Sequence, residues 1–266
     1  MRLSVLVVVL FFLFAQQAPS HAEVFQYFDE QGTRIVTDNP YGVKRPGPRQ
    51  SPMPTVHASG PNIRPAFGPE FMGDASYDYY PVTGRSFQEA VESAMAQGPP
   101  DQLDGKRYPG QTRWNLGWSY KFEASHKREG SNLHAFITIY DFAFRSDVTV
   151  LLPRLTPESK LPDHDLKLWD NFVKGLLDHE NDHVRITRDP GYQAEALRKI
   201  SAVRELFIPY DPLPDPQVLV KDAVEAETAK IGYALIRTIK AKNDDYDRVT
   251  EHGLRPEMKA VFFGQQ

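Results

Sequence analysis

LKLWDNFVKGLLDHENDHVRITR, at residues 166–188, is the most informative stretch of the sequence for the fold and for a functional site. Asp163 or Asp165 can cap the start of a helix here, and Asp189-Pro190-Gly191 is expected to end or sharply bend it. The stretch therefore predicts one long amphipathic helix. Its apolar residues recur at helical spacing, at Trp169, Phe172, Val173, Leu176 and Leu177.

His179, Glu180 and His183 form an H-E-x-x-H pattern within this predicted helix. Residues four apart lie on the same face of a helix, so the two imidazoles point the same way. That face is predicted to be buried, because Phe172 and Ile186 fall on the same stripe. Two imidazoles there can share a zinc ion, with Glu180 as general base for a water molecule. The alternative interpretation is a buried helix face with two hydrogen-bonded histidines.

The composition is that of a globular protein and limits the kinds of site it can build. The chain has 266 residues, 41% of them hydrophobic and 25% charged, which suits one large or two small domains. Its formal net charge is −4 and it has no cluster of basic residues, so we expect no nucleic-acid partner. It has no cysteine, which excludes disulfides and zinc-thiolate sites. Any metal must therefore be held by histidines and carboxylates.

Residues 1–22 have the order of a secretory signal peptide. Arg2 precedes an apolar run from Leu3 to Ala15, and a polar segment follows that ends at Ala22. We expect cleavage after Ala22, which makes the protein periplasmic or secreted. A membrane anchor is the alternative, but the apolar run is shorter than the about 20 residues that a bilayer span needs. No stable membrane span is therefore expected after cleavage.

Two further segments precede the main domain. Residues 23–40 predict a β-hairpin, because two alternating segments flank a turn at residues 29–32. With its aromatic-x-aromatic, Asp-x-x-Gly and Thr-Asp pattern, this hairpin resembles the small domain of unknown function found at the start of many exported bacterial proteins. Docking to a partner in the cell envelope is one interpretation of its role. Eight prolines between residues 40 and 69 predict a linker over residues 41–76, with a proline-rich docking peptide as the alternative.

Residues 77–255 predict an α+β domain, because several strands precede several helices. We expect a largely antiparallel sheet, followed by a helical half that contains the H-E-x-x-H helix. Residues 256–266 are expected to form a C-terminal tail. The expected strands are residues 77–82, 112–123, 133–144 and 147–152, and the other expected helices are residues 87–97, 192–207 and 217–242.

The third metal ligand is not fixed by spacing. A catalytic zinc ion takes three protein ligands and a water molecule, so two histidines leave one ligand to be found. Glutamates on predicted helices suit a solvated face, and a single histidine outside a helix is usually a surface residue. The segment from Tyr246 to Gly253 is dense in liganding groups and follows a long predicted helix. The downstream candidates are Glu195, Glu205, Glu225, Glu227, Asp247 and His252.

The order of motifs from Tyr77 to Gly253 resembles a bacterial family of unknown function described as predicted secreted zinc-dependent proteases. The resemblance has two departures: Asp189-Pro190-Gly191 interrupts a helix that often continues in other members, and the sheet region lacks the cysteine that some members carry. The shared features are Tyr80 with Gly84, Arg107-Tyr108-x-Gly110-x-Thr112-x-Trp114, a strand ending at Leu152-Pro153, the Trp169 helix with its H-E-x-x-H pattern, and the closing Tyr246-Asp247-x-x-Thr250-x-His252-Gly253.

The resemblance implies a zincin-like metallopeptidase domain over residues 77–255. It implies that His252 joins His179 and His183 as the third zinc ligand, with Asp247 as the alternative. Glu180 would be the general base, and Tyr246 is a candidate donor to the oxyanion of a peptide or protein substrate. Two other functions stay open at this point. One is a non-catalytic envelope module with a structural metal, and the other is a zinc hydrolase of a non-peptide cell-wall amide.

Overall fold

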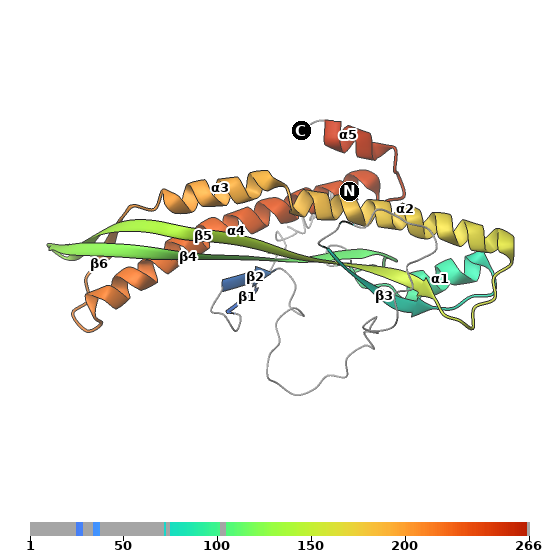
Figure 1. The fold of residues 1–266 in the computed structure, drawn as a ribbon, viewed down its shortest axis with the longest axis horizontal. Helices are drawn as coiled ribbons and strands as arrows, with labels where there is room; N and C mark the ends of the chain where they lie inside the picture. Colours follow the sequence, from blue (N-terminus) through green and yellow to red (C-terminus); the bar gives the residue numbers. More distant parts are fainter. Residues whose placement is uncertain (1–24, 29–33, 38–71, 73–74, 102–104, 265–266) are drawn as a thin grey trace, which may run out of the picture.

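A long hairpin of two strands is the frame of the fold in the computed structural model (Figure 1). The structure describes residues 25–28, 34–37, 72, 75–101 and 105–264. Strand β4 (Gln111–Glu129) pairs antiparallel with β5 (Asn132–Leu155) along almost its whole length. Gly130, with a φ of 62°, takes the left-handed conformation at the turn between them.

The other strands add to both edges of this hairpin. On one side, β1 (Phe25–Phe28) pairs with β2 (Arg34–Thr37), and β2 pairs with β4, all antiparallel. On the other side, β5 pairs with β6 (Glu205–Pro209) at its start and with β3 (Ser76–Val82) at its end. The predicted α+β class is confirmed. The sheet is largely antiparallel, as predicted, and the exception is β3, which runs parallel to β5.

The prediction of separate strands at residues 133–144 and 147–152 is wrong, because β5 is continuous. Arg145 and Ser146, expected to join two strands, pair with Gly117 and Leu116 of β4. The irregularity lies a few residues earlier, where the register shifts at Ser119 and Asp141 has a φ of 51°. A bulge bends a hairpin without ending it.

Local signals predicted the first helices well. Helix α1 (Phe87–Gln97) begins as expected after Ser86, whose hydroxyl accepts a hydrogen bond from the backbone N–H of Glu89. Helix α2 (Asp163–Thr187) contains the whole H-E-x-x-H pattern. Its expected side-chain cap is absent among the described residues, and Asp165 instead accepts a hydrogen bond from the backbone of Phe87. The predicted bend is confirmed, because Asp189 caps a new helix, α3 (Pro190–Ser201).

Two predicted helix ends were wrong. The helix expected at residues 192–207 stops at Ser201, because the following residues form β6 on the edge of β5. The helix expected at residues 217–242 continues as α4 (Pro216–Thr250). Tyr246 and Asp247 therefore lie on a helix and not in a loop. The sequence there favours an end, but the amide of Asn243 donates to the backbone carbonyl of Ile239, and burial stabilises the extra turns.

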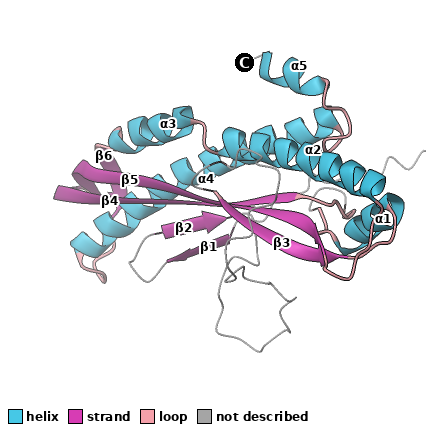
Figure 2. Cartoon of the chain, turned by 45° about the vertical axis from the view of Figure 1, so that its right-hand side comes forward, coloured by secondary structure: helices cyan, strands magenta, loops and turns pink. Residues whose placement is uncertain are grey.

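Helices α2, α3 and α4 pack on one face of the sheet (Figure 2). Trp114, Leu116 and Trp118 alternate along β4 and are buried beneath these helices. α4 crosses close to the sheet, since a Cβ atom on Gly232 would lie 2.1 Å from the ring of Trp118. This close crossing carries the end of α4 alongside α2. α4 thereby brings residues from far along the chain next to His183.

Some predictions fall on residues that the structure does not describe. The predicted signal peptide and most of the predicted linker lie outside the described residues, so these boundaries stay predictions. The segment expected to be a C-terminal tail contains a short helix, α5 (Met258–Gly264), whose Phe262 is buried. Within the described part of the chain, no helix has both the length and the apolar character needed to cross a membrane.

Candidate metal centre

Three donor atoms converge where α2 meets α4. His179 and His183 are one turn apart on α2 and both are buried, with 3.1 Å between their Nε2 atoms. Asp247 of α4 lies opposite them. Its Oδ1 is 3.0 Å from His179 Nε2 and 2.9 Å from His183 Nε2. These three residues form a group that can hold a metal ion.

The spacing of the three donor atoms fits such an ion. Ligands at about 2.0–2.1 Å from a tetrahedral zinc ion lie roughly 3.3 Å from one another. The observed separations of 2.9 to 3.1 Å are close to this value. Two imidazole nitrogens this close repel each other unless a proton or a metal ion lies between them, because two unprotonated nitrogens would direct lone pairs at each other. A proton or a metal ion must therefore occupy the centre of the group.

Asn243 fixes the orientation of one imidazole. Its amide nitrogen donates to the carbonyl of Ile239, which leaves the amide oxygen facing His183. His183 Nδ1 lies 2.8 Å from that oxygen, so Nδ1 carries the proton and donates it. In the neutral ring, Nε2 is then the free acceptor directed at Asp247. This is the tautomer that a metal ligand requires.

The charges in the group favour a bound cation. Burial by itself would lower the pKa of His183, but the negative charges of Asp247 and Glu180 outweigh it and raise this pKa to about 9. Burial would likewise raise the pKa of Asp247, but the two histidines outweigh it and hold this pKa well below its ordinary value. In the metal-free protein, a protonated His183 thus pairs with an ionised Asp247. A divalent cation would replace that proton.

Glu180 lies on α2 beside this group, with its carboxyl buried at the start of β4. Its Oε2 accepts a hydrogen bond of 2.8 Å from the hydroxyl of Thr112. A Cβ atom on Gly110 would lie 2.4 Å from its Oε1, so only glycine leaves room for the carboxyl group there. Burial raises the pKa of Glu180. A carboxyl group beside the converging donor atoms is placed to take up and release a proton, as a general base must.

Tyr246 contacts the histidines with its ring and not with its hydroxyl. The ring stacks on His179, with 5.0 Å between the ring centroids, and meets His183 edge-on at 5.2 Å. The hydroxyl donates to the carboxylate of Asp182 at 2.7 Å, and Tyr246 is fully buried. The predicted oxyanion donor is thus hydrogen-bonded to another residue in this structure.

His252, the third ligand that the resemblance implies, lies at the edge of the group. Its Nδ1 is 3.6 Å from Asp247 Oδ1, and its ring stacks on Tyr108 with 3.8 Å between centroids. In this structure Asp247, predicted as the alternative, is therefore the third converging donor. The four glutamate candidates lie elsewhere, in contacts of Glu195 with Lys199, Glu205 with His134, Glu225 with Lys221 and Glu227 with Lys230.

The structure shows why the motif from Tyr246 to Gly253 ends in a glycine. Glu251, His252 and Gly253 have φ values of 50°, 54° and 83°, so the backbone turns sharply in the left-handed region after α4. This turn presses the backbone against His179. A Cβ atom on Gly253 would lie 3.1 Å from Cγ of that ring. The glycine therefore lets the chain cover His179 directly.

Sequence reasoning missed Asn243, Thr112 and Asp182 as parts of the site. Asn243 and Asp247 are four residues apart, so a helix places them on one face, and this signal was hidden because the helix was predicted to end at residue 242. Thr112 was assigned to a strand and to a motif shared with the family, but not to a role at the metal group. Asp182 lies inside the H-E-x-x-H pattern, at a position that the pattern leaves unspecified.

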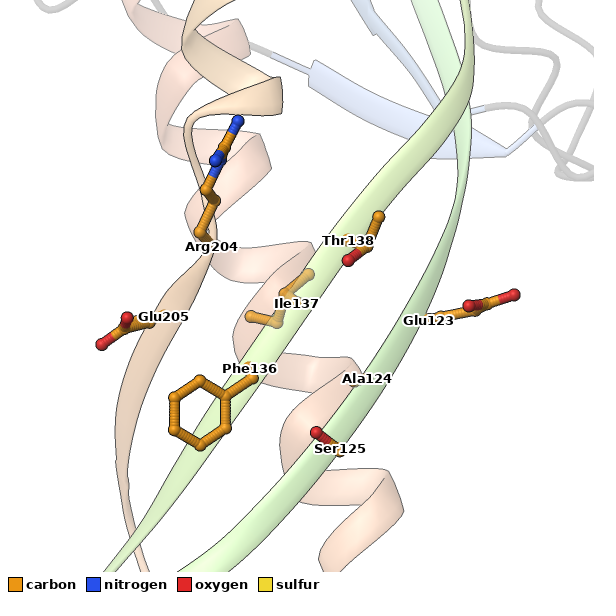
Figure 3. A pocket seen from close by; sticks show the side chains of 8 residues that line it. All are labelled: Glu123, Ala124, Ser125, Phe136, Ile137, Thr138, Arg204 and Glu205. Carbon is orange, nitrogen blue, oxygen red and sulfur yellow. The ribbon is translucent and has the colours of Figure 1, made fainter.

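A surface hollow of about 470 Å³ lies on the distant half of the sheet, between β4, β5 and β6 (Figure 3). Phe136 and Ile137 of β5 lie at its centre, with Arg204 and Glu205 along one side. It contains none of the residues of the metal group. Its polar side chains do not converge on one point (Figure 3). Among the described residues, the group of converging metal donors lies at the junction of α2 and α4.

Comparison with known protein families gives a match that includes this junction. The family described as "Bacterial protein of unknown function (DUF922)" matches residues 77–253, about two thirds of the chain. The chain belongs to this family. The family match spans the three donor residues, Glu180 and Gly253, but its description names no activity. No match was found among curated proteins or among solved structures.

Proposed function

We propose that the protein is a zinc-dependent hydrolase in which His179, His183 and Asp247 hold the metal and Glu180 is the general base. The observation that carries this proposal is the convergence of three donor atoms beside a buried carboxyl group. Two imidazoles and one carboxylate are a donor set that suits zinc. His252 is the alternative ligand, because its ring lies next to Asp247.

The residues around the metal group support proton transfer. A zinc ion bound there would lower the pKa of a water molecule and polarise a carbonyl group. Glu180 would take a proton from that water and pass it to the leaving amine. The Thr112 hydroxyl holds one oxygen of Glu180 in place, which fixes the direction in which the carboxyl group acts. Asn243 accepts the Nδ1 proton of His183 and so keeps this ring in the tautomer that binds metal.

We propose that the enzyme cleaves a peptide bond. We also propose that the enzyme itself is periplasmic or secreted. Residues 147–152 of β5 do not offer a substrate an open edge, because most of this stretch lies between β3 and β4. The start of β4 suits a substrate strand better. It carries Thr112 beside Glu180, and among the described residues its pairing with β2 begins only at Leu116.

Replacing Glu180 tests this proposal directly. The full chain is purified, its zinc content is measured, and hydrolysis of a fluorogenic peptide library is followed. We expect about one zinc ion per chain, and in Glu180→Gln the same zinc content but a rate lower by about 10²–10⁴-fold. Glu205→Gln is the matched control, since Glu205 is a glutamate paired with His134. A wild-type chain that binds no zinc, or an unchanged rate in Glu180→Gln, would overturn the proposal.

A non-catalytic role with a structural metal is the second candidate, and the position of His252 favours it. A structural zinc site has four protein ligands, whereas a catalytic site leaves one position for water. His252 lies near enough to Asp247 to join the group after a small movement. If His252→Ala loses zinc as completely as His179→Ala does, and the wild type hydrolyses no amide, the structural role is the correct one.

A further inference from the structure

Helix α5 contacts the H-E-x-x-H segment although it lies beyond the family match. Figures 1 and 2 show α5 on the side of α2 and α4 that faces away from the sheet. Lys259 of α5 places its Nζ 2.6 Å from Oδ2 of Asp182. Asp182 is fully buried and stands directly before His183. The C-terminal segment is thus attached to the helix that carries the histidines.

Asp182 collects three hydrogen-bond donors from three helices. Arg185 of α2 donates to Oδ1 at 2.9 Å, while Tyr246 of α4 donates to Oδ2 at 2.7 Å and Lys259 of α5 approaches the same atom. A fully buried carboxylate is stable only when its charge is compensated and its oxygens accept hydrogen bonds. Arg185 and Lys259 supply the positive charge. Tyr246 is held by the oxygen that Lys259 also contacts.

The ring of Tyr246 connects this carboxylate to the metal group. One face stacks on His179, and the ring meets His183 edge-on. On other sides Phe262 and Phe263 of α5 contact it, with centroid distances of 5.1 and 5.7 Å. Tyr246 is therefore enclosed between the two histidines and α5. Its ring can move only if α5 or the Asp182 contact gives way.

We propose that α5 is a clasp for the metal centre, in which Lys259, Asp182 and Tyr246 are positioning residues for His179 and His183. Lys259 fixes Asp182, Asp182 fixes the Tyr246 hydroxyl, and the Tyr246 ring fixes the orientation of both imidazoles. This inference deepens the proposed function and rests on it for the identity of the bound ion. It assigns to residues outside the family match a role in metal affinity.

Zinc affinity is the first test, measured on the full chain by competition with a chromophoric chelator. Residues that orient metal ligands typically change metal affinity by about 10–100-fold. We expect Lys259→Met and Tyr246→Phe to weaken zinc binding by about tenfold, and Lys259→Arg to restore it. Lys230→Met is the matched control, because Lys230 also pairs with a carboxylate but lies on the outer surface of α4.

A metal-free measurement separates the clasp from the proposed function. The imidazole NMR signals of His179 and His183 report the ring positions without any ion. We expect Lys259→Met and Tyr246→Phe to move both signals, and Lys230→Met to leave them in place. If the wild type binds zinc, and Lys259→Met binds it equally well with unmoved signals, the clasp is wrong while the hydrolase proposal stands. If the wild type binds no zinc, the hydrolase proposal is wrong. In that case the clasp is also overturned if the imidazole signals stay in place in both Lys259→Met and Tyr246→Phe.

Discussion

In the part of the chain that the structure describes, two groups combine buried histidine with carboxylate, and one of the two has the geometry of a metal site. At the junction of α2 and α4, the nitrogens of His179 and His183 and one oxygen of Asp247 point at a common centre. At the far end of the β4–β5 hairpin, His134 has Glu129 3.5 Å from its Nδ1 and Glu205 3.1 Å from its Nε2. The carboxylates of this second group lie at different ring nitrogens.

The difference comes from the backbone that carries each group. A helix places residues four apart on one face, so two imidazoles on α2 converge. His134 lies on a strand and stacks between Phe136 and Phe207, with 4.2 Å between centroids in each pair. Its glutamates are also more exposed, since 43% and 58% of their side-chain surface is accessible, against 16% for Asp247. Convergence and burial, and not composition, distinguish a candidate metal site from a surface ion pair.

The largest effect should come from removing one converging ligand. We expect His183→Ala to weaken zinc binding by on the order of 1,000-fold, because the remaining two donors no longer enclose the ion. His134→Ala removes a histidine of the second group and should leave zinc affinity unchanged. Isothermal titration calorimetry on both variants measures the effect. Equal losses in the two variants would contradict the comparison.

The next effect is the pH dependence of the metal-free protein. The pKa of His183 is raised from 6.5 to about 9, so its stabilisation is complete below pH 6.5 and is lost as the pH rises to 9. The pKa of Asp247 is lowered from 3.8, so its stabilisation is complete above that pH and is lost on acidification. The contribution of this pair to stability should therefore be greatest between pH 3.8 and 6.5. It should fall by roughly 3 kcal/mol by pH 9 to 10.

Chemical denaturation of the chelator-treated protein across this pH range measures the dependence. Asp247→Asn removes the charge that raises the pKa of His183, so the alkaline loss should shrink. Asp245→Asn is the matched control, because Asp245 pairs with Arg248 on the exposed side of the same helix. If Asp245→Asn flattens the profile as much as Asp247→Asn does, the pair at the metal group is not its cause.

The smallest effect compares two glycines with positive φ, one at each group. Gly253 lies against His179, whereas Gly130 lies at the tip of the hairpin with no atom within 4 Å of a built Cβ. Alanine at either position adds backbone strain of about 1–2 kcal/mol. Gly253→Ala should cost about 1 kcal/mol more in the free energy of unfolding, because its methyl group presses on His179. Thermal denaturation, with and without zinc, measures the loss of stability in each variant. Equal losses in Gly253→Ala and Gly130→Ala would show that the contact with His179 is unimportant.

Half of the candidate site was predictable because its information is local. The spacing of His179, Glu180 and His183 on one helix follows from the 3.6-residue period alone. The choice between His252 and Asp247 depends on how α4 ends, which the sequence predicted eight residues too early, at 242 instead of Thr250. Burial of Asn243 and Tyr246 against α2 extends the helix and places Asp247 over the histidines. Contacts across more than 60 residues of chain are not encoded in a short pattern.

The fold divides in the same way. Hydrophobic alternation and helix caps determined that strands precede helices, that a helix begins after Ser86, and that Asp189-Pro190-Gly191 bends the chain. These features depend on neighbours within a few residues. Tertiary structure decided that β3 runs parallel to β5 and that β6 adds to the sheet edge. It also decided that α5 reaches Asp182. Each of these results depends on which surfaces are left to be covered once the long hairpin and α2 have packed together.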